Sequence, residues 1–237
     1  IEGDADLCDR INRLAREMTL DVEATVEAGA VKLTATGING HAAYPEGARN
    51  AIGEMLLMLR ALGVTGPLKT LADTIGMEYN GESLNAACSD HTSGALTCNL
   101  GVIRYDANGL YAELDFRFPL LANGERIAKT VQAALGADID AKVAGLKQPH
   151  HVAPTSPLVT ALLNAYHEET GRPRECVATG GGTYARCLAE GVAFGASFPE
   201  DEDVAHQANE YMSLDVMMQN VRIIARAIVS LAGAENA

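Results

Sequence analysis

Four short motifs contain side chains that bind anions, metals or protons, and the first runs from Gly40 to Ala51. Small residues surround His41 and leave its imidazole room to reach a ligand. Pro45 and Gly47 favour a turn beside it. Taken by itself, the motif favours a turn histidine that helps to start the next helix, because few lone histidines are functional.

The second motif is Asp115–Pro119, in which Arg117 occupies the polar side of an alternating strand, opposite Phe116 and Phe118. A planar guanidinium suits a carboxylate, to which it donates two parallel hydrogen bonds. The alternative is an exposed cross-strand partner for a neighbouring acid. For a single arginine that alternative is favoured.

The third motif is Thr179–Thr183, a run of three glycines between two threonines at a predicted strand-to-helix junction. Backbone without side chains and the N–H groups at a helix start form a cradle for a carboxylate or another anion. The motif lacks the GKS/T ending of a P-loop and the spacing of a dinucleotide fingerprint, which argues against nucleotide binding. A tight turn without a ligand is an equally weighted alternative.

The fourth motif is the acidic loop Phe198–Glu210, which contains His206 and follows the apolar run Val192–Phe198. Open α/β sheets place their sites at the carboxyl ends of strands, and neutral imidazole is a common zinc ligand. Asn209 or Glu210 is suited to orient such a ligand. The alternative is a surface histidine in an acidic loop.

The elements that position the first two motifs alternate between helices and hairpin strands. Asp4 is expected to cap the first helix, and Gly63 to end the second. Helical spacing and strand alternation predict helices over 5–18, 52–62 and 127–135, and strands over 22–26, 31–33, 96–103 and 110–118. Residues 64–94 receive no assignment. Residues 1–148 are therefore predicted to form an α+β domain, an antiparallel sheet with helices on one face.

The pattern changes near Gln148–Pro157, and residues 149–237 are predicted to form a second unit. Helices are expected from Ser156 to Gly171, after Thr183 and from Ser213 onward, with buried strands at 176–178 and 192–198. Buried strands between helices predict α/β architecture. A sheet of two or three strands is marginally stable, and we therefore expect this unit to belong to a larger sheet. We also expect it to expose a sheet edge or an apolar surface through which it could associate.

Composition excludes several classes of protein. Eighteen basic against 31 acidic residues give a net charge of −13, which argues against a nucleic-acid partner. No uninterrupted apolar run approaches the length of a membrane span, and no signal peptide is visible. The five scattered cysteines form no CxxC pair, which favours a reducing, cytoplasmic location.

Together, the four motifs resemble the aminoacylase/carboxypeptidase-like metallopeptidases, family M20, in order and spacing. Gly40–Ala51 resembles the histidine motif of the family's lid domain, and Asp115–Pro119 resembles its lid arginine strand. Thr179–Arg186 and Val192–Glu210 resemble the PepV-like dipeptidase branch. The resemblance covers nearly the whole chain, and the last two motifs are the most specific.

The resemblance implies a lid domain at 1–148 and the C-terminal part of an α/β zinc-peptidase catalytic domain at 149–237. It implies that His206 binds one of two zinc ions, with manganese or cobalt as alternatives. It implies that His41 stabilises the oxyanion of the reaction and that Arg117 binds the substrate carboxylate. Gly181, Gly182 and Thr183 would line the substrate pocket. The implied reaction is cleavage of the amide bond of dipeptides or short peptides by a metal-activated water.

The sequence departs from the family pattern because no HxD element occurs in it. The remaining metal ligands and the general base are expected in a preceding segment of the same protein. We therefore expect this chain alone to be inactive and to hold no metal. Two alternatives are a hydrolase of N-acyl amino acids in the same family and a non-catalytic α+β binding or association module.

Overall fold

The structure is a computed structural model that describes residues 3–195, 197–202, 204–205 and 209–233. The chain divides into two compact units, Ile1–Pro149 and His150–Ala237, which we call the N-terminal and C-terminal units. Each has its own hydrophobic core, and each is described by itself.

The N-terminal unit begins with an amphipathic helix packed on a hairpin. Helix α1 spans Ala5–Glu17, and the side chain of Asp4 caps it by accepting from the Leu7 N–H at 3.2 Å. Strands β1 (Val22–Glu27) and β2 (Ala30–Ala35) pair antiparallel. Ala28 and Gly29 join them with positive φ angles, as a two-residue hairpin turn requires. Ile11 of α1 and Val31 of β2 lie in the small core between them.

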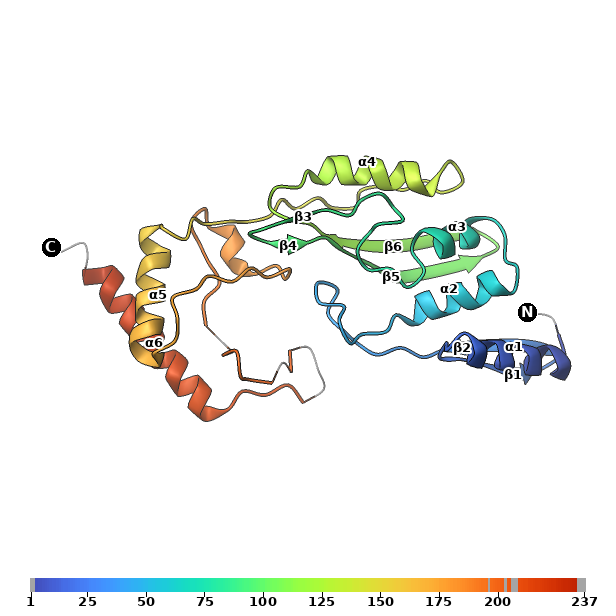
Figure 1. The fold of residues 1–237 in the computed structure, drawn as a ribbon, viewed down its shortest axis with the longest axis horizontal. Coiled ribbons are helices and arrows are strands. Elements are labelled where there is room, and N and C mark those ends of the chain that lie inside the picture. The colour runs from blue at the N-terminus through green and yellow to red at the C-terminus, as the bar shows by residue number, and fades with distance from the viewer. Residues whose placement is uncertain (1–2, 196, 203, 206–208, 234–237) are drawn as a thin grey trace. The chain divides into compact units, whose positions relative to one another are not determined.

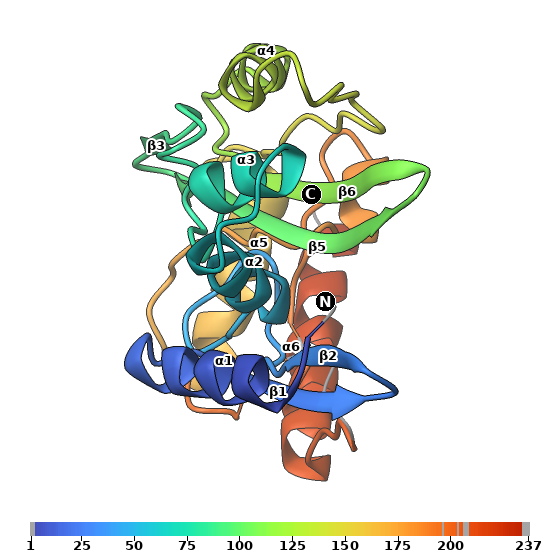
Figure 2. The same ribbon diagram turned by 90° about the vertical axis from the view of Figure 1, so that its right-hand side faces the viewer.

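Helix α2 (Ala51–Ala61) lies between this hairpin and a second one, β5–β6, in both views of the ribbon (Figures 1 and 2). Met58 faces the small core under α1, whereas Leu56 faces the main core under β5. The sequence pattern predicts α1, the first hairpin and α2, and the structure confirms them.

Residues 64–94, which carry no clear periodicity, form helix α3 (Pro67–Thr74) and, after a stretch of turns, strand β3 (Ser89–Asp90). Strand β3 pairs with β4 (Gly94–Ala95) in a two-residue ladder. Leu71 and Leu84 of this region are about 1% exposed. The region is therefore part of the main core rather than a surface loop.

Strands β5 (Thr97–Asp106) and β6 (Gly109–Arg117) form the long hairpin of the unit, and Thr97 pairs with Arg117 at its open end. Helix α4 (Gly124–Leu135) begins at Asn123, whose side chain accepts from the Arg126 N–H. One face of the hairpin packs with α2, α3 and α4 in the main core. These helices and small antiparallel sheets confirm the predicted mixed fold class.

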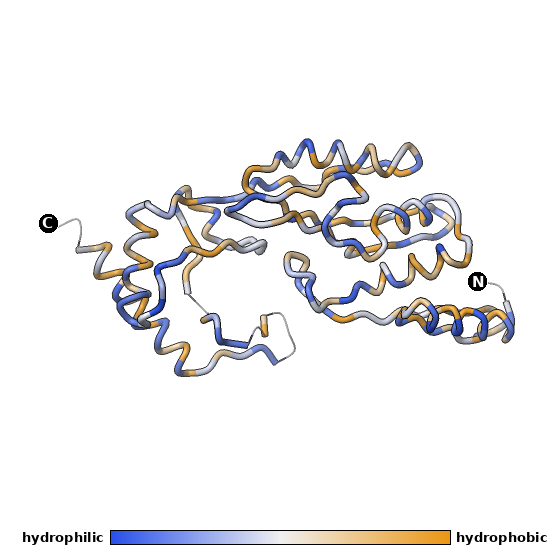
Figure 3. Tube along the Cα trace, viewed as in Figure 1, coloured by the Kyte–Doolittle hydropathy of each residue, from blue (hydrophilic) through white to orange (hydrophobic). Residues whose placement is uncertain are grey.

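The C-terminal unit contains two long helices, α5 (Pro157–Thr170) and α6 (Leu214–Gly233), which pack on each other. Ser156 caps α5, and Gly171 ends it in the left-handed conformation. Ala165, Phe198, Ile223 and Ala227 form the core of the unit. In Figure 3, hydrophobic and hydrophilic residues alternate along α6.

Much of the apolar surface of α6 is exposed. Val221, Ile228 and Val229 are 52%, 60% and 73% exposed. By length and composition α6 is also the one described helix that could cross a membrane. Arg222 and Arg226 of α6 form ion pairs with Glu169 at the end of α5.

The strands predicted at 176–178 and 192–198 are wrong. In the described residues of both segments the chain runs without a β-ladder. Between α5 and α6, the described residues form one regular element, the short 3-10 helix η1, Tyr184–Cys187. A strand needs hydrogen bonds to a neighbouring strand, and neither segment has such a neighbour within the described part of the chain. Apolar composition alone therefore does not produce a strand here.

Candidate active site

The loop that contains His41 is closed at its base by a backbone pair. The Ile38 N–H donates to the Arg49 carbonyl at 2.9 Å, and the Arg49 N–H donates back to the Ile38 carbonyl at 3.0 Å. The two arms touch above this pair, because a Cβ on Gly40 would come within 2.3 Å of the Ala48 Cβ. The loop is therefore a tight structure held at a defined base.

The His41 ring is oriented within this loop. Its Nδ1 accepts a hydrogen bond from the Ala43 N–H at 3.1 Å, and its ring centroid lies 5.5 Å from that of Tyr44. In a neutral imidazole whose Nδ1 accepts, the proton sits on Nε2. His41 therefore offers an Nε2–H donor, the form that an oxyanion requires.

Asn50 joins the base of this loop to the hairpin that carries Arg117. Its Oδ1 caps α2 by accepting from the Ile52 N–H at 2.8 Å. Its Nδ2 donates to the Asn99 side chain at 3.0 Å and to the Leu100 carbonyl at 2.9 Å, both in β5. His41 and Arg117 thus belong to one hydrogen-bonded framework within the N-terminal unit.

Arg117 ends strand β6 and is half-buried. Its Nη2 donates to Asp115 Oδ2 at 2.6 Å, on the same strand two residues earlier. One acid paired with Arg117 is therefore Asp115, on its own strand. A guanidinium has five N–H donors in a planar fork, and the geometry of that fork matches a carboxylate.

The chain after Arg117 is fixed by Asp90 in strand β3 and by Ser93 in the turn between β3 and β4. Asp90 Oδ2 accepts from the Leu121 N–H at 3.0 Å, and Ser93 Oγ accepts from the Leu120 N–H at 2.7 Å. The Leu121 and Ser93 N–H groups stabilise the ionised carboxylate and lower the pKa of Asp90 to about 2. The carboxylate is therefore charged at neutral pH and holds the segment that follows the arginine strand.

The glycine motif of the C-terminal unit forms a turn that leads into η1. The Gly181 N–H donates to Thr179 Oγ1 at 3.1 Å, and Thr183 precedes η1 in extended conformation. A Cβ on Gly182 would lie 3.5 Å from the guanidinium of Arg186. Gly182 and Thr183 are exposed. This turn presents a cation and backbone to solvent, which suits an anion.

His206 lies outside the described residues, so its role as a metal ligand stays a prediction. The start of its loop is anchored by Phe198, which stacks on Tyr166 and lies 4.4 Å under the Arg172 guanidinium. Asp201 Oδ2 accepts from the Phe198 N–H at 2.7 Å and closes a turn there. The core of the unit therefore fixes where the acidic loop begins.

Among the residues that the structure describes, no three His, Cys, Asp or Glu side chains come together as a metal site. The described donors by themselves do not fit a metal ion. Among the described candidates, His41, Arg117 and the glycine motif supply hydrogen bonding and charge.

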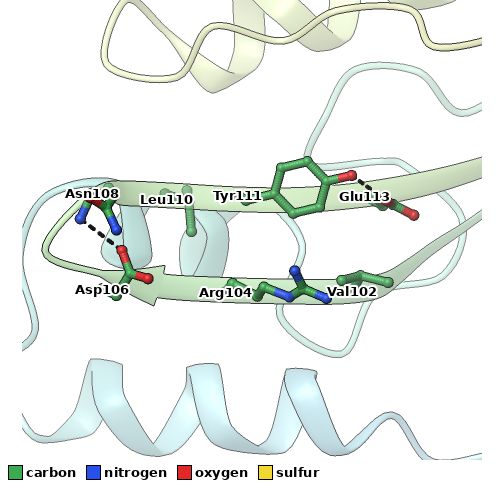
Figure 4. A pocket seen from close by; sticks show the side chains of 8 residues that line it. Val102, Arg104, Asp106, Asn108, Leu110, Tyr111 and Glu113 are labelled. Atoms are coloured by element: carbon green, nitrogen blue, oxygen red, sulfur yellow. Dashed lines mark hydrogen bonds between the residues drawn. The ribbon is translucent and has the colours of Figure 1, made fainter.

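A pocket on the β5–β6 hairpin contains none of the predicted site residues. Figure 4 shows the Tyr111 hydroxyl directed at Glu113 on β6, with Arg104 on the neighbouring strand β5. The pocket is lined by Val102, Arg104, Asp106, Asn108, Gly109, Leu110, Tyr111 and Glu113. These residues near the hairpin turn are separate in sequence from Arg117 at the open end.

Two carboxylates of the framework, Glu54 and Asp90, were not found from the sequence. Glu54 is 1% exposed, although it occupies a helix whose pattern marks only its apolar face. The one sequence signal for Glu54 is a basic residue, Arg49, five positions before it. Asp90 carries the turn signal Asp-x-x-Ser-Gly in a segment that had received no assignment.

Comparison with known proteins gives the family. The model of peptidase family M20/M25/M40 matches residues 6–230. The chain belongs to this family, and the resemblance seen in its four motifs is thereby confirmed. Members of the family generally bind metal ions.

The similar curated proteins carry dipeptidase names. The chain is 35% identical over 220 residues to "Putative dipeptidase YtjP" of Bacillus subtilis, covering 89% of this chain and 46% of that protein. It is 31% identical over 200 residues to Beta-Ala-Xaa dipeptidase of Lactobacillus delbrueckii subsp. lactis, covering 82% and 43%. A "Putative dipeptidase" of Staphylococcus epidermidis is 30% identical, covering 97% and 50%. The chain spans about half the length of these relatives.

Proposed function

We propose that this chain contributes the substrate-closing lid and the C-terminal part of the catalytic domain of a metal-dependent dipeptidase. Residues 1–148 form the lid, and residues 149–237 belong to the catalytic domain. The observation that carries the proposal is the His41 ring in its closed loop, where Nδ1 accepts from the Ala43 N–H, and from this we infer Nε2–H as the donor. Membership of the M20 family and the names of the relatives support the choice of reaction.

Each candidate residue has one task in this proposal. His41 donates its Nε2–H to the oxygen of the scissile carbonyl as negative charge develops there, so it stabilises the transition state more than the ground state. Arg117 binds the substrate carboxylate through donors that Asp115 does not use. Gly181, Gly182 and Thr183 line the pocket near that carboxylate.

Metal ions, zinc or alternatively manganese or cobalt, would polarise the carbonyl and activate water in the complete site, with His206 as one ligand. We further propose that the remaining ligands and the general base come from another segment of the same protein. This chain alone is then inactive toward dipeptides. A reducing, cytoplasmic location completes the proposal.

The test of Arg117 uses the full-length protein and pairs of dipeptides that differ only in a free carboxylate or a carboxamide at the C-terminus. We expect Arg117→Met to raise KM for the free acid roughly 10- to 100-fold, because a lost charge-assisted bond costs about 1.5–3 kcal/mol. The preference for the acid over the amide should fall equally. Arg104→Met, on the same hairpin, serves as the matched control and should change neither value.

The same assays test His41 and the substrate class. His41→Ala should lower kcat by about 10²- to 10³-fold with little change in KM, as expected for one lost oxyanion donor. Dipeptides should be hydrolysed faster than N-acetyl amino acids. An Arg117→Met enzyme that still prefers the acid, or a fully active His41→Ala enzyme, contradicts the assigned role.

A further inference from the structure

Glu54 is a buried carboxylate to which the proposed reaction gives no task. It sits in the first turn of α2 and is 1% exposed, whereas its ion-pair partner Arg49 is half-buried. A buried charge requires a specific compensating partner, since desolvation otherwise opposes it. The contacts of both carboxylate oxygens therefore show what this residue holds in place.

One oxygen of Glu54 holds the base of the histidine loop. Arg49 Nε donates to Glu54 Oε1, and the same guanidinium donates through Nη2 to the Thr19 carbonyl at 2.6 Å. Arg49 is also the residue whose backbone pairs with Ile38 to close the loop. Glu54 thus fixes the C-terminal arm of the loop through the side chain of Arg49.

The other oxygen of Glu54 reaches the N-terminal arm. Glu54 Oε2 accepts from the Asp21 N–H at 2.9 Å, and the carbonyl of Asp21 accepts from the Thr36 N–H at 2.9 Å. Thr36 lies two residues before Ile38. The arms also pack without space between them, because a Cβ on Gly37 would come within 2.4 Å of the Arg49 carbonyl oxygen.

We infer that Glu54 is the positioning residue of the His41 loop, acting through Arg49 and Asp21 to fix where the imidazole donor is presented. This inference rests on the role proposed for His41. Both arms of the loop converge on one carboxylate located 13 residues after the histidine. Loss of that carboxylate should loosen the loop while the main core, which packs on other residues of α2, stays intact.

The test uses the full-length protein and three variants. Glu54→Gln removes the charge. The double variant Arg49→Met/Glu54→Met replaces both partners by apolar side chains of similar length, which keeps the buried site packed if the single variant fails to fold. Asp73→Asn is the matched control, because Asp73 of α3 pairs at 2.8 Å with Arg60 of α2, the helix that carries Glu54, away from the loop.

Two readouts need no substrate. Hydrogen exchange should accelerate at least tenfold for amides within residues 38–49 in the Glu54 variants and stay unchanged for β5 and β6. The nitrogen-15 spectrum of the His41 ring, assigned with His41→Ala, should show the Nε2–H tautomer in the parent protein and a mixture of tautomers in the variants. Asp73→Asn should match the parent in both.

Activity gives the third readout. We expect kcat to fall at least tenfold in the Glu54 variants with KM within about twofold, because a misplaced donor affects only the transition state. Folded Glu54 variants with unchanged loop exchange and an unchanged His41 tautomer would overturn the inference. A fully active His41→Ala enzyme instead refutes the proposed function, and the two substrate-free readouts still decide the role of Glu54.

Discussion

The N-terminal unit and the C-terminal unit hold their candidate residues in different ways. The base of the His41 loop is closed by the Ile38–Arg49 backbone pair and anchored to residues 30 to 50 positions away, through the bonds from Arg49 to Thr19 and from Asn50 to Leu100. In the glycine motif, Gly181 bonds Thr179 two residues away, and Gly182 and Thr183 are exposed. A site residue placed by distant partners is fixed by the fold, whereas one placed by neighbours is fixed only by its turn.

The hydrophobic cores of the two units also differ in how many side chains they bury. Buried side chains from three helices and a hairpin meet in the N-terminal unit, and the core includes Leu71, Leu84 and Leu100 at about 1% exposure. Among the described residues of the C-terminal unit, the core cluster holds four buried side chains, and much of α6 is exposed. Stability is therefore expected to depend on single side chains mainly in the N-terminal unit.

The largest effect should come from truncating the main core. Leu100→Ala is expected to lower the free energy of unfolding by about 2–5 kcal/mol, because it leaves a cavity in a packed site. Val229→Ala on the exposed face of α6 should change it by less than about 0.5 kcal/mol. Denaturant titration of both variants measures the contrast. A cost above about 2 kcal/mol for Val229→Ala would show that this face is covered in the full-length protein.

A smaller loss of stability is expected when the capping residue of α2 or of α5 is replaced, and the two losses should differ. Asn50→Ala is expected to cost roughly 2–3 kcal/mol, because it removes a cap and leaves the Leu100 carbonyl without its side-chain donor. Ser156 caps α5 with a bond to the Val159 N–H, and Ser156→Ala should cost about 1 kcal/mol. Equal costs in thermal unfolding would mean that the bonds from Asn50 to β5 add nothing to the cap.

The smallest perturbation is thiol labelling, which compares the reactivity of cysteines in the two units without any substitution. Burial raises the pKa of Cys98 in β5 to about 12, so at pH 8 only about one thiol in ten thousand is ionised. Cys176 and Cys187 in the C-terminal unit are exposed. A thiol reagent should label these two within minutes and Cys98 only after unfolding, as peptide mass spectrometry can follow. Rapid labelling of Cys98 in the native protein would show that β5 opens readily.

The sequence by itself determined the local elements and the family. Asp4 and Ser156 precede the helices that they start, and the alternation over 110–118 marks strand β6. These signals depend on residues within one or two turns, so they can be read without knowing the fold. His41 and Arg117 could be named as candidates from the sequence because their motifs are contiguous.

The tertiary structure decided what depends on distant partners. The apolar segments 176–178 and 192–198 predicted strands, but a strand forms only beside another strand. Residues 64–94 gave no periodic signal, yet they supply core residues and the Asp90 contacts that hold the chain after Arg117. Glu54 reads as a polar helix position, and only the fold shows that its carboxylate meets Arg49 and Asp21. Burial and long-range hydrogen bonds arise from chain segments far apart in sequence, which no local pattern contains.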